Sequence, residues 1–311
     1  MVDQFQSKPT LKELYDDVIK AAEAAGVTCN AEAVWNLLTT YEEFFSNSAV
    51  SLRTTTKPSD KRELSVRYIE LEKQHDPYAI ALEKGYIVLQ GHPVEKVIPE
   101  LQSRYPMLGY GVDVGAEHGF EKIWPFFQVE VPLEEIYTLS SLPPSIKNYA
   151  AHFRKYRFTK VGLLAVDFWN KSVNLYFYSS NRETFVPERL AEMLKDLGFG
   201  IPPAEELEQS TRALAVYYTF SWESEFVERV CFVMAVPEEL VPKHLHPLFE
   251  QYVNNVPIRS QRRIFFYNTT YAMNGDYLKI EADYRGTMSE ALRTAAEASM
   301  RASTHRSSPL H

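Results

Sequence analysis

Five basic side chains lie at positions where they could bind one polyanion together. Each belongs to a segment in which apolar and polar residues alternate, and each is on the polar side. They are Arg53, Arg67, Lys122, Arg229 and Lys279, and Asn174 has an equivalent position. Cations brought together inside a protein repel one another, so an anionic ligand is the natural compensation. Arg pairs with phosphate oxygens and Lys adds a mobile charge, which predicts a diphosphate ligand; the alternative for any one residue is a salt bridge to a carboxylate.

Aromatic residues follow the same alternation. Trp124 and Tyr176 each lie two positions after a member of that set, and Tyr217 lies in the segment before another. Residues two apart in a strand point the same way, so an aromatic ring is expected beside each anion contact. Loss of diphosphate from an allylic chain leaves a carbocation, which aromatic rings stabilise while excluding water. Packing in a core is the alternative for any single ring.

The alternating segments form five pairs that predict five β-hairpins, separated by stretches with helical periodicity. The hairpins recur about every 50 to 57 residues, a spacing typical of structural repeats. The pairs are residues 49–56 with 63–71, 108–115 with 119–127, 160–168 with 172–179, 212–222 with 225–236, and 262–272 with 276–285. The expected helices are 11–26, 31–45, 78–85, 92–105, 144–156, 187–198, 246–256 and 288–299.

One face of these strands is apolar and the other is polar. Val173 alternates with Asn174, for example, and Ile280 alternates with Lys279. If the apolar faces pack against the helices, the polar faces line an interior, and closure of the sheet removes its exposed edges. We therefore predict an α+β fold: a closed, ten-stranded antiparallel barrel with a solvent-filled lumen, ringed by helices in five ααββ repeats. An open sheet with its polar face in water is the alternative.

Composition and charge limit the classes of partner that the protein is expected to bind. The 311 residues are 45% hydrophobic and carry a formal charge of −8, which argues against a nucleic-acid or membrane surface as the main partner. Two distant cysteines, Cys29 and Cys231, and the lack of an apolar leader or a long apolar run predict a reduced, cytoplasmic protein. We expect a monomer with one domain over residues 1–301 and a flexible tail over 302–311.

Several common sites are missing from the sequence. It contains neither of the glycine-rich nucleotide motifs GxxxxGK[ST] and GxGxxG, nor the acidic DDxxD motif that binds metal-diphosphate. His244 and His246 could suggest a metal, but no third ligand is evident and we expect none. Side-chain cations must therefore bind the anion.

The sequence resembles a known family in several segments that keep their order along the chain. These are HDPYAIALEKG, GHPV, GFEKIWPFF, VNLYF, SWESEFVERVCF and GDYLKIEADYRGTMSE. Together they resemble the soluble aromatic prenyltransferases of the ABBA barrel type, known from the bacterial naphterpin and clorobiocin pathways and from fungi. The resemblance implies a ten-stranded barrel that transfers a dimethylallyl or geranyl group from its diphosphate to a phenol, hydroxynaphthalene, aminocoumarin precursor or dihydrophenazine.

The resemblance also implies roles for residues. It makes Arg53, Arg67, Lys122, Asn174, Arg229 and Lys279 the diphosphate contacts. Tyr176 and Tyr217 would shield the prenyl chain, and Glu281 would accept a hydrogen bond from the acceptor. Ser65 stands where magnesium-dependent members have Asp, and Arg67 faces the same side, so we expect activity without Mg²⁺ and no cofactor.

Further candidates for the prenyl shield and acceptor pocket are Trp124, Gly162, Leu164, Leu214, Ala215 and Asp283. The expected reaction is electrophilic aromatic substitution, with the five-carbon donor favoured over the longer one. For Glu281, a salt bridge to a lumen Arg is an equal alternative. Two rival classes stay open: a non-catalytic barrel that binds a small anionic or prenylated ligand, and a terpene-type lyase, which the missing acidic motifs disfavour.

Overall fold

A computed structural model describes residues 9–71, 75–179 and 183–306. Its centre is a closed antiparallel barrel in which every strand pairs with its neighbours along the chain and β1 pairs with β10. The strands are β1 Ala49–Thr55, β2 Leu64–Glu70, β3 Met107–Gly115, β4 Gly119–Pro132, β5 Lys160–Asp167, β6 Ser172–Tyr178, β7 Ala215–Ser221, β8 Arg229–Pro237, β9 Ile264–Ala272 and β10 Tyr277–Asp283. The predicted closed ten-stranded barrel is confirmed.

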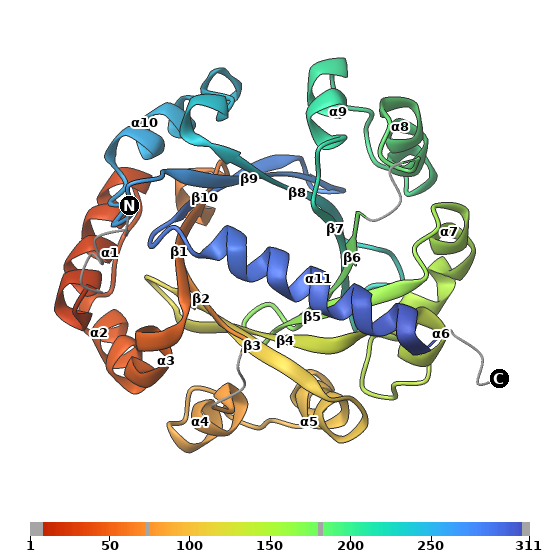
Figure 1. Ribbon diagram of the computed structural model, residues 1–311, viewed down its shortest axis with the longest axis horizontal. Helices are drawn as coiled ribbons and strands as arrows, with labels where there is room; N and C mark the ends of the chain where they lie inside the picture. Colours follow the sequence, from red (N-terminus) through yellow and green to blue (C-terminus); the bar gives the residue numbers. More distant parts are fainter. Residues whose placement is uncertain (1–8, 72–74, 180–182, 307–311) are drawn as a thin grey trace.

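Helices surround the barrel, as Figure 1 shows. They are α1 Leu11–Ala25, α2 Ala31–Thr40, α3 Glu42–Asn47, α4 Pro77–Glu83, α5 Val94–Arg104, α6 Leu133–Ile136, α7 Ala150–Lys155, α8 Pro187–Asp196, α9 Ala204–Ser210, α10 Pro247–Asn255 and α11 Met288–Arg306. The single helix expected over 31–45 is divided at Tyr41 into α2 and α3. Helix α9 lies in a stretch for which no helix was predicted.

The apolar faces of the strands pack against this helical ring. Val66, Val173 and Ile280 are buried there, in one cluster with residues of α1, α5 and α8. Because successive side chains of a strand point to opposite sides, their neighbours point into the lumen. This agrees with the predicted alternation. The lumen differs from the prediction in being partly apolar, since a second cluster inside it contains Trp124 and Phe266.

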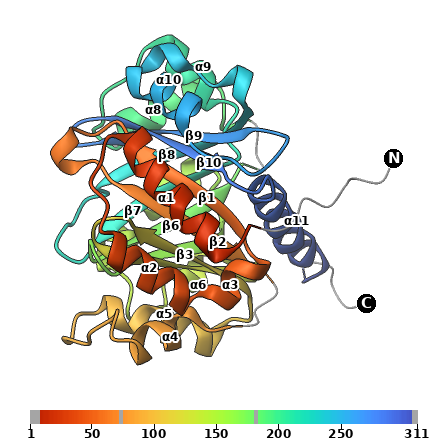
Figure 2. The same cartoon turned by 90° about the vertical axis from the view of Figure 1, so that its left-hand side faces the viewer.

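Helix α11 is placed differently from the other helices. It lies across one end of the barrel, as the two views in Figures 1 and 2 agree. Its start is fixed by Asp283, which accepts hydrogen bonds from the backbone N–H groups of Met288 (3.0 Å) and Ser289 (3.3 Å). The helix runs to Arg306 and so includes residues 302–306, which were predicted to belong to a flexible tail. The rest of the predicted tail lies outside the described residues.

The two ends of the barrel have different connections. The turns within all five hairpins lie at one end, because the strands pair in sequence order. The helical connections enter at the other end, where α11 lies. In the described part of the chain, no helix combines the length and apolar character needed to cross a membrane.

Gly109 offers a test of barrel packing. A Cβ at this position would lie 2.1 Å from the backbone oxygen of Glu70 and 2.4 Å from Cα of Leu71, neither of which can move without disturbing β2. We expect Gly109→Ala to lower the free energy of unfolding by about 2–3 kcal/mol, in the range of overpacked cores. Denaturant unfolding followed by circular dichroism measures the loss.

The matched control is Gly200→Ala. Gly200 has nothing within 4 Å of the position that a Cβ would occupy, and it is exposed. We expect a change within about 0.5 kcal/mol for such a surface position. Equal effects of the two substitutions would contradict the packing described for β2 and β3.

Candidate active site

The lumen holds two neighbouring cavities that share lining residues, which we call the basin and the chamber. The basin lies at the end of the hairpin turns, has a volume of about 90 Å³ and is lined mostly by polar side chains. Its cations are Arg53, Lys57, Lys61, Lys122, Arg229 and Lys279. A cavity so small and so rich in positive charge suits an anionic head group.

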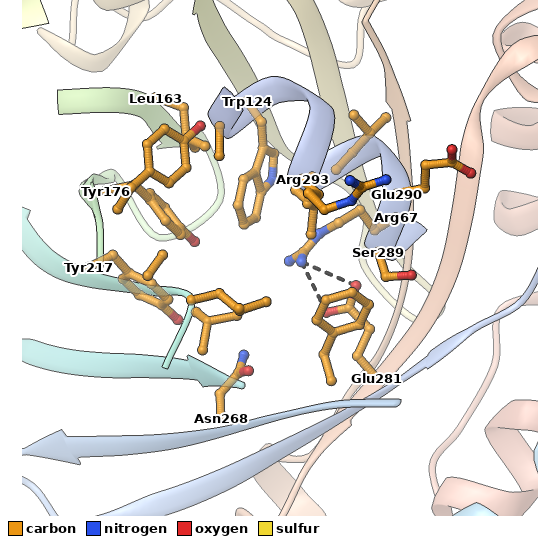
Figure 3. A pocket seen from close by; sticks show the side chains of 18 of the residues that line it. Arg67, Trp124, Leu163, Tyr176, Tyr217, Asn268, Glu281, Ser289, Glu290 and Arg293 are labelled. Atoms are coloured by element: carbon orange, nitrogen blue, oxygen red, sulfur yellow. Dashed lines mark hydrogen bonds and ion pairs between the residues drawn. The ribbon is translucent and has the colours of Figure 1, made fainter. Parts of the chain in front are cut away.

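The chamber lies at the other end, beneath α11. Its volume of about 730 Å³ is within the range of small-molecule sites. Aromatic and apolar side chains from the strands form much of its wall, and residues of α11 close it. Figure 3 shows Trp124, Tyr176 and Tyr217 on one side of it, with Arg67 and Glu281 facing them.

Three aromatic residues lie where the two cavities meet. Trp124, Tyr176 and Tyr217 line both of them. Ring centroids lie 4.5 Å apart for Tyr176 and Tyr217 and 5.2 Å apart for Trp124 and Tyr176, so the three rings form a row where the two cavities meet. Burial raises the pKa of both tyrosines well above the usual value, which keeps them as neutral phenols. A cation formed at this junction would meet ring faces and little water.

Arg67 lies at the centre of a buried charge network. Its Nε donates to Oδ1 of Asp113 (2.7 Å), its Nη2 donates to Oδ2 (3.1 Å), and its Nη1 donates to Oε2 of Glu281 (3.0 Å). The guanidinium lies 4.0 Å from the centre of the Trp124 ring. Arg53 joins the network through Nη2, 3.1 Å from Oδ2 of Asp113. Burial favours the neutral acid, but Arg67 and Arg53 outweigh it and hold the pKa of Asp113 below its ordinary value.

Two further hydrogen-bonded groups fix the basin. Lys122 Nζ lies 2.7 Å from Oδ2 of Asp167, whose burial is outweighed by Lys122 and Asn170, so that its pKa is lowered. Arg229 Nε donates to Oγ1 of Thr219 (3.0 Å), and Thr219 donates to Oδ1 of Asn174 (2.7 Å). These contacts hold the side chains in place around the space that a ligand would fill.

Lys279 has a neutral partner. Its Nζ donates a hydrogen bond to the hydroxyl of Tyr217, and the lysine is 8% exposed. Burial, together with the charges of Arg53 and Arg229, lowers the pKa of Lys279 to about 7. Among the described residues, neither Lys279 nor Arg229 has a carboxylate within ion-pair distance. These two cations are therefore the least compensated in the basin.

The structure brings most of the predicted site residues together. Arg53, Lys122, Asn174, Arg229 and Lys279 line the basin. Arg53 also lines the chamber, as do Arg67, Trp124, Tyr176, Leu214, Ala215, Tyr217 and Glu281. Arg67 is thus placed with the chamber residues, apart from the other predicted diphosphate contacts. Gly162 lies against the chamber wall, because a Cβ there would be 2.1 Å from the ring of Tyr178.

Two acceptor-pocket predictions are wrong. Leu164 points outward into the helical layer, and its neighbour Leu163 lines the chamber. A one-residue error in the alternation places a side chain on the opposite face. Asp283 is not among the chamber residues, since it caps α11. His244 contacts Glu205 at 2.8 Å, and no cluster of three metal-ligating side chains occurs in the described part of the chain.

The sequence reasoning missed several charged members of the site. Asp113 and Asp167 neutralise Arg67 and Lys122, and both could have been found because they lie on the polar side of their strands. Lys57 lies in the first hairpin turn and reaches the basin, 4.8 Å from the centre of the Tyr277 ring. Glu121 also lines the basin, against the expected alternation.

The chain is similar in sequence and in fold to known proteins. The family described as "Aromatic prenyltransferase Orf2" matches residues 10–296. The 5,10-dihydrophenazine-1-carboxylate 9-dimethylallyltransferase of Streptomyces anulatus is 32% identical over 87% of this chain and 92% of the relative. Flaviolin linalyltransferase of Streptomyces virginiae is 30% identical over 88% and 92% of the two chains. The solved 5-dimethylallyltryptophan synthase of Streptomyces coelicolor shares the fold, with a TM-score of 0.58 at 10% identity over 91% of this chain and 99% of the other.

The charge network predicts a large effect of Arg67→Met on stability. The substitution keeps an apolar stem but leaves Glu281 without its cation and Asp113 with Arg53 alone. Breaking a buried ion pair in this way costs about 3–5 kcal/mol. Urea unfolding measures the change, and Arg67→Met combined with Glu281→Gln should recover part of the loss.

Lys12→Met is the control for the same change of side chain. Lys12 pairs with Asp16 on the surface of α1, with 64% of its side chain exposed, and such pairs add little stability. A small loss for Arg67→Met, similar to that of Lys12→Met, would mean that the network does not hold the barrel together.

Proposed function

This chain belongs to the aromatic prenyltransferase family described as Orf2, and we propose that it transfers a dimethylallyl group from its diphosphate to an electron-rich aromatic acceptor without Mg²⁺. The family is one of transferases, which answers the rival interpretation of a non-catalytic barrel. The observation that carries the proposal is the joining of a cationic basin to an aromatic chamber through Trp124, Tyr176 and Tyr217.

In the proposed reaction, the basin holds the diphosphate and stabilises its charge as the carbon–oxygen bond breaks. The allyl group lies at the junction, where the rings of Tyr176 and Tyr217 shield the developing cation from water. The acceptor lies in the chamber and attacks with its ring carbon. Substitution is completed when the ring loses a proton. The relatives that act on a dihydrophenazine and on flaviolin support fused aromatic acceptors, including hydroxynaphthalenes, and phenols fit the same chemistry.

Polar atoms of the chamber fit an acceptor with hydroxyl or amine groups. Trp124 Nε1 and Asn268 Oδ1 are buried and find no hydrogen-bond partner in the described part of the chain. Both residues line the chamber, and Figure 3 shows them with Glu281 around the same space. Buried polar groups need partners, so an acceptor that supplies them would be favoured over an apolar one.

The proposed independence of Mg²⁺ rests on side-chain charge. Six cations line the basin, and Ser65 stands on β2 where the magnesium-dependent enzymes of the resemblance have Asp. We expect full turnover of dimethylallyl diphosphate with a hydroxynaphthalene in excess EDTA, measured by mass spectrometry of the product and by release of pyrophosphate. Loss of turnover that added Mg²⁺ restores would contradict this part of the proposal.

Glu281 is proposed to orient the acceptor by accepting a hydrogen bond from its hydroxyl group. The carboxylate lies in the chamber, held by Arg67 and by a hydrogen bond from Ser51. Glu281→Gln should lower kcat at least about ten-fold, a size typical of lost acid–base assistance, while affinity for pyrophosphate stays close to wild type.

Glu290→Gln makes the same chemical change at the chamber wall on α11 and should have much less effect. A screen of phenols, hydroxynaphthalenes and dihydrophenazines with both variants measures kcat for each acceptor. Unchanged kcat for Glu281→Gln would refute the proposal that Glu281 orients the acceptor. The ion pair with Arg67 would then be the reason that a carboxylate lies in the chamber.

A further inference from the structure

A carboxyl group in the basin has no place in the mechanism described so far. Glu121 lies at a β-bulge between β3 and β4: Asp113 pairs with Lys122 and Val114 pairs with Phe120, which leaves Glu121 as the extra residue. A bulge allows two adjacent side chains to point to the same side. Both Glu121 and Lys122 therefore line the basin.

The surroundings of Glu121 give a hydrogen-bond partner to only one of its two carboxyl oxygens. Its Oε2 accepts a hydrogen bond from Oγ of Ser65 (3.2 Å), and its Oε1 is buried without a hydrogen-bond partner among the described residues. A Cβ on Gly115 would lie 2.4 Å from Oε1, so the carboxyl group occupies space that only glycine leaves open there. Glu121 is 3% exposed.

The nearby cations are bound to other acids. Lys122 pairs with Asp167 at 2.7 Å, and Arg53 pairs with Asp113 at 3.1 Å. Around the carboxyl group, the basin and its wall contribute these charged side chains: Arg53 on β1, Glu63 before β2, Asp113 on β3, Lys122 on β4, and, farther across the basin, Lys57, Lys61, Arg229 and Lys279.

This environment favours the neutral form of the acid. Burial is the largest cause that raises the pKa of Glu121, to about 8. The negative charges of Asp113 and Glu63 also raise this pKa, whereas the positive charges of Lys122 and Arg53 lower it. Below that pH the group is a carboxylic acid with an O–H to donate. Above it, the group is an anion in a cavity built for an anion, where like charge would weaken binding.

We propose that Glu121, which lines the basin, binds the diphosphate as a neutral hydrogen-bond donor. This inference rests on the proposed function, because it requires a diphosphate in the basin. A hydrogen bond to an oxygen that gains negative charge strengthens as the bond to carbon breaks, so the contact would assist departure as well as binding. No proton needs to be transferred.

Three variants separate a neutral donor from an anion. Glu121→Gln keeps the shape and an N–H donor but cannot ionise, and Glu121→Ala removes the donor. Ser65→Ala removes the contact to Oε2 and also the hydrogen bond that the Ser65 hydroxyl accepts from Nη2 of Arg53 (3.3 Å). Binding of inorganic pyrophosphate to the full chain is measured by isothermal titration calorimetry in EDTA, from about pH 7 to about pH 9.5. Thermal unfolding confirms that each variant is folded.

At pH 7 we expect Glu121→Gln to bind pyrophosphate within about three-fold of wild type, and Glu121→Ala to bind about ten-fold more weakly, as for a lost hydrogen bond to a charged group. From pH 7 to 9.5, affinity should fall about ten-fold more for wild type than for Glu121→Gln, because only wild type ionises at this position. Lys279 and the ligand itself also titrate, but they are common to both proteins and cancel in the comparison. Ser65→Ala should keep the wild-type pH dependence.

Three results would overturn the proposal. Equal pH dependence of wild type and Glu121→Gln would show that Glu121 does not ionise in this range. Equal loss in Glu121→Gln and Glu121→Ala, with wild-type binding that requires Mg²⁺, would show that the group acts as an anion that binds a metal. No binding of pyrophosphate to wild type at any pH would overturn the diphosphate basin, and with it the proposed function on which this inference rests.

Discussion

Charge inside a closed barrel is the constraint on which the rest of this structure depends. Closure of β1 onto β10 pairs every edge but removes the inward side chains from bulk water. Charges placed there need partners within the lumen, since burial of an unpaired charge costs several kcal/mol. Asp113 is the ion-pair partner of both Arg67 and Arg53, and Asp167 is the partner of Lys122. The cations left without carboxylates, Arg229 and Lys279, lie where the ligand's charge would be.

The same constraint divides the lumen along its axis. Charged residues gather at the end of the hairpin turns, where they line the basin. Apolar and aromatic residues gather at the other end, where α11 lies across the barrel. Trp124, Tyr176 and Tyr217 lie where the two environments meet. A reaction that separates an anion from a carbocation needs both environments within a few ångströms, and this barrel supplies them from one set of strands.

The alternation in the sequence was enough to predict the strands and their inward faces, because period 2 is a direct consequence of strand geometry. It placed Asn174 and Tyr176 in the lumen correctly. It failed where the period is broken or misread: Glu121 enters the basin through a bulge, and Leu164 was assigned to the face of Leu163. Asp113 and Asp167 follow the rule as well, but alternation alone does not show which cations they pair with, because their partners Arg67 and Lys122 lie on neighbouring strands. The place of α11 could not be predicted, since its apolar residues indicate a buried face without indicating which surface covers it.

The role of Arg67 depends on the residues that surround it in the structure. From the sequence, an Arg on β2 near Ser65 was expected to replace a metal at the diphosphate. In the structure, two carboxylates and the face of Trp124 surround its guanidinium, so most of its charge is already compensated. Arg67 positions other residues of the site: it pairs with Asp113, which in turn pairs with Arg53 at the basin, and with Glu281, which lines the chamber. One buried cation thus links the geometry of the two cavities, and a disturbance of either end reaches the other through it.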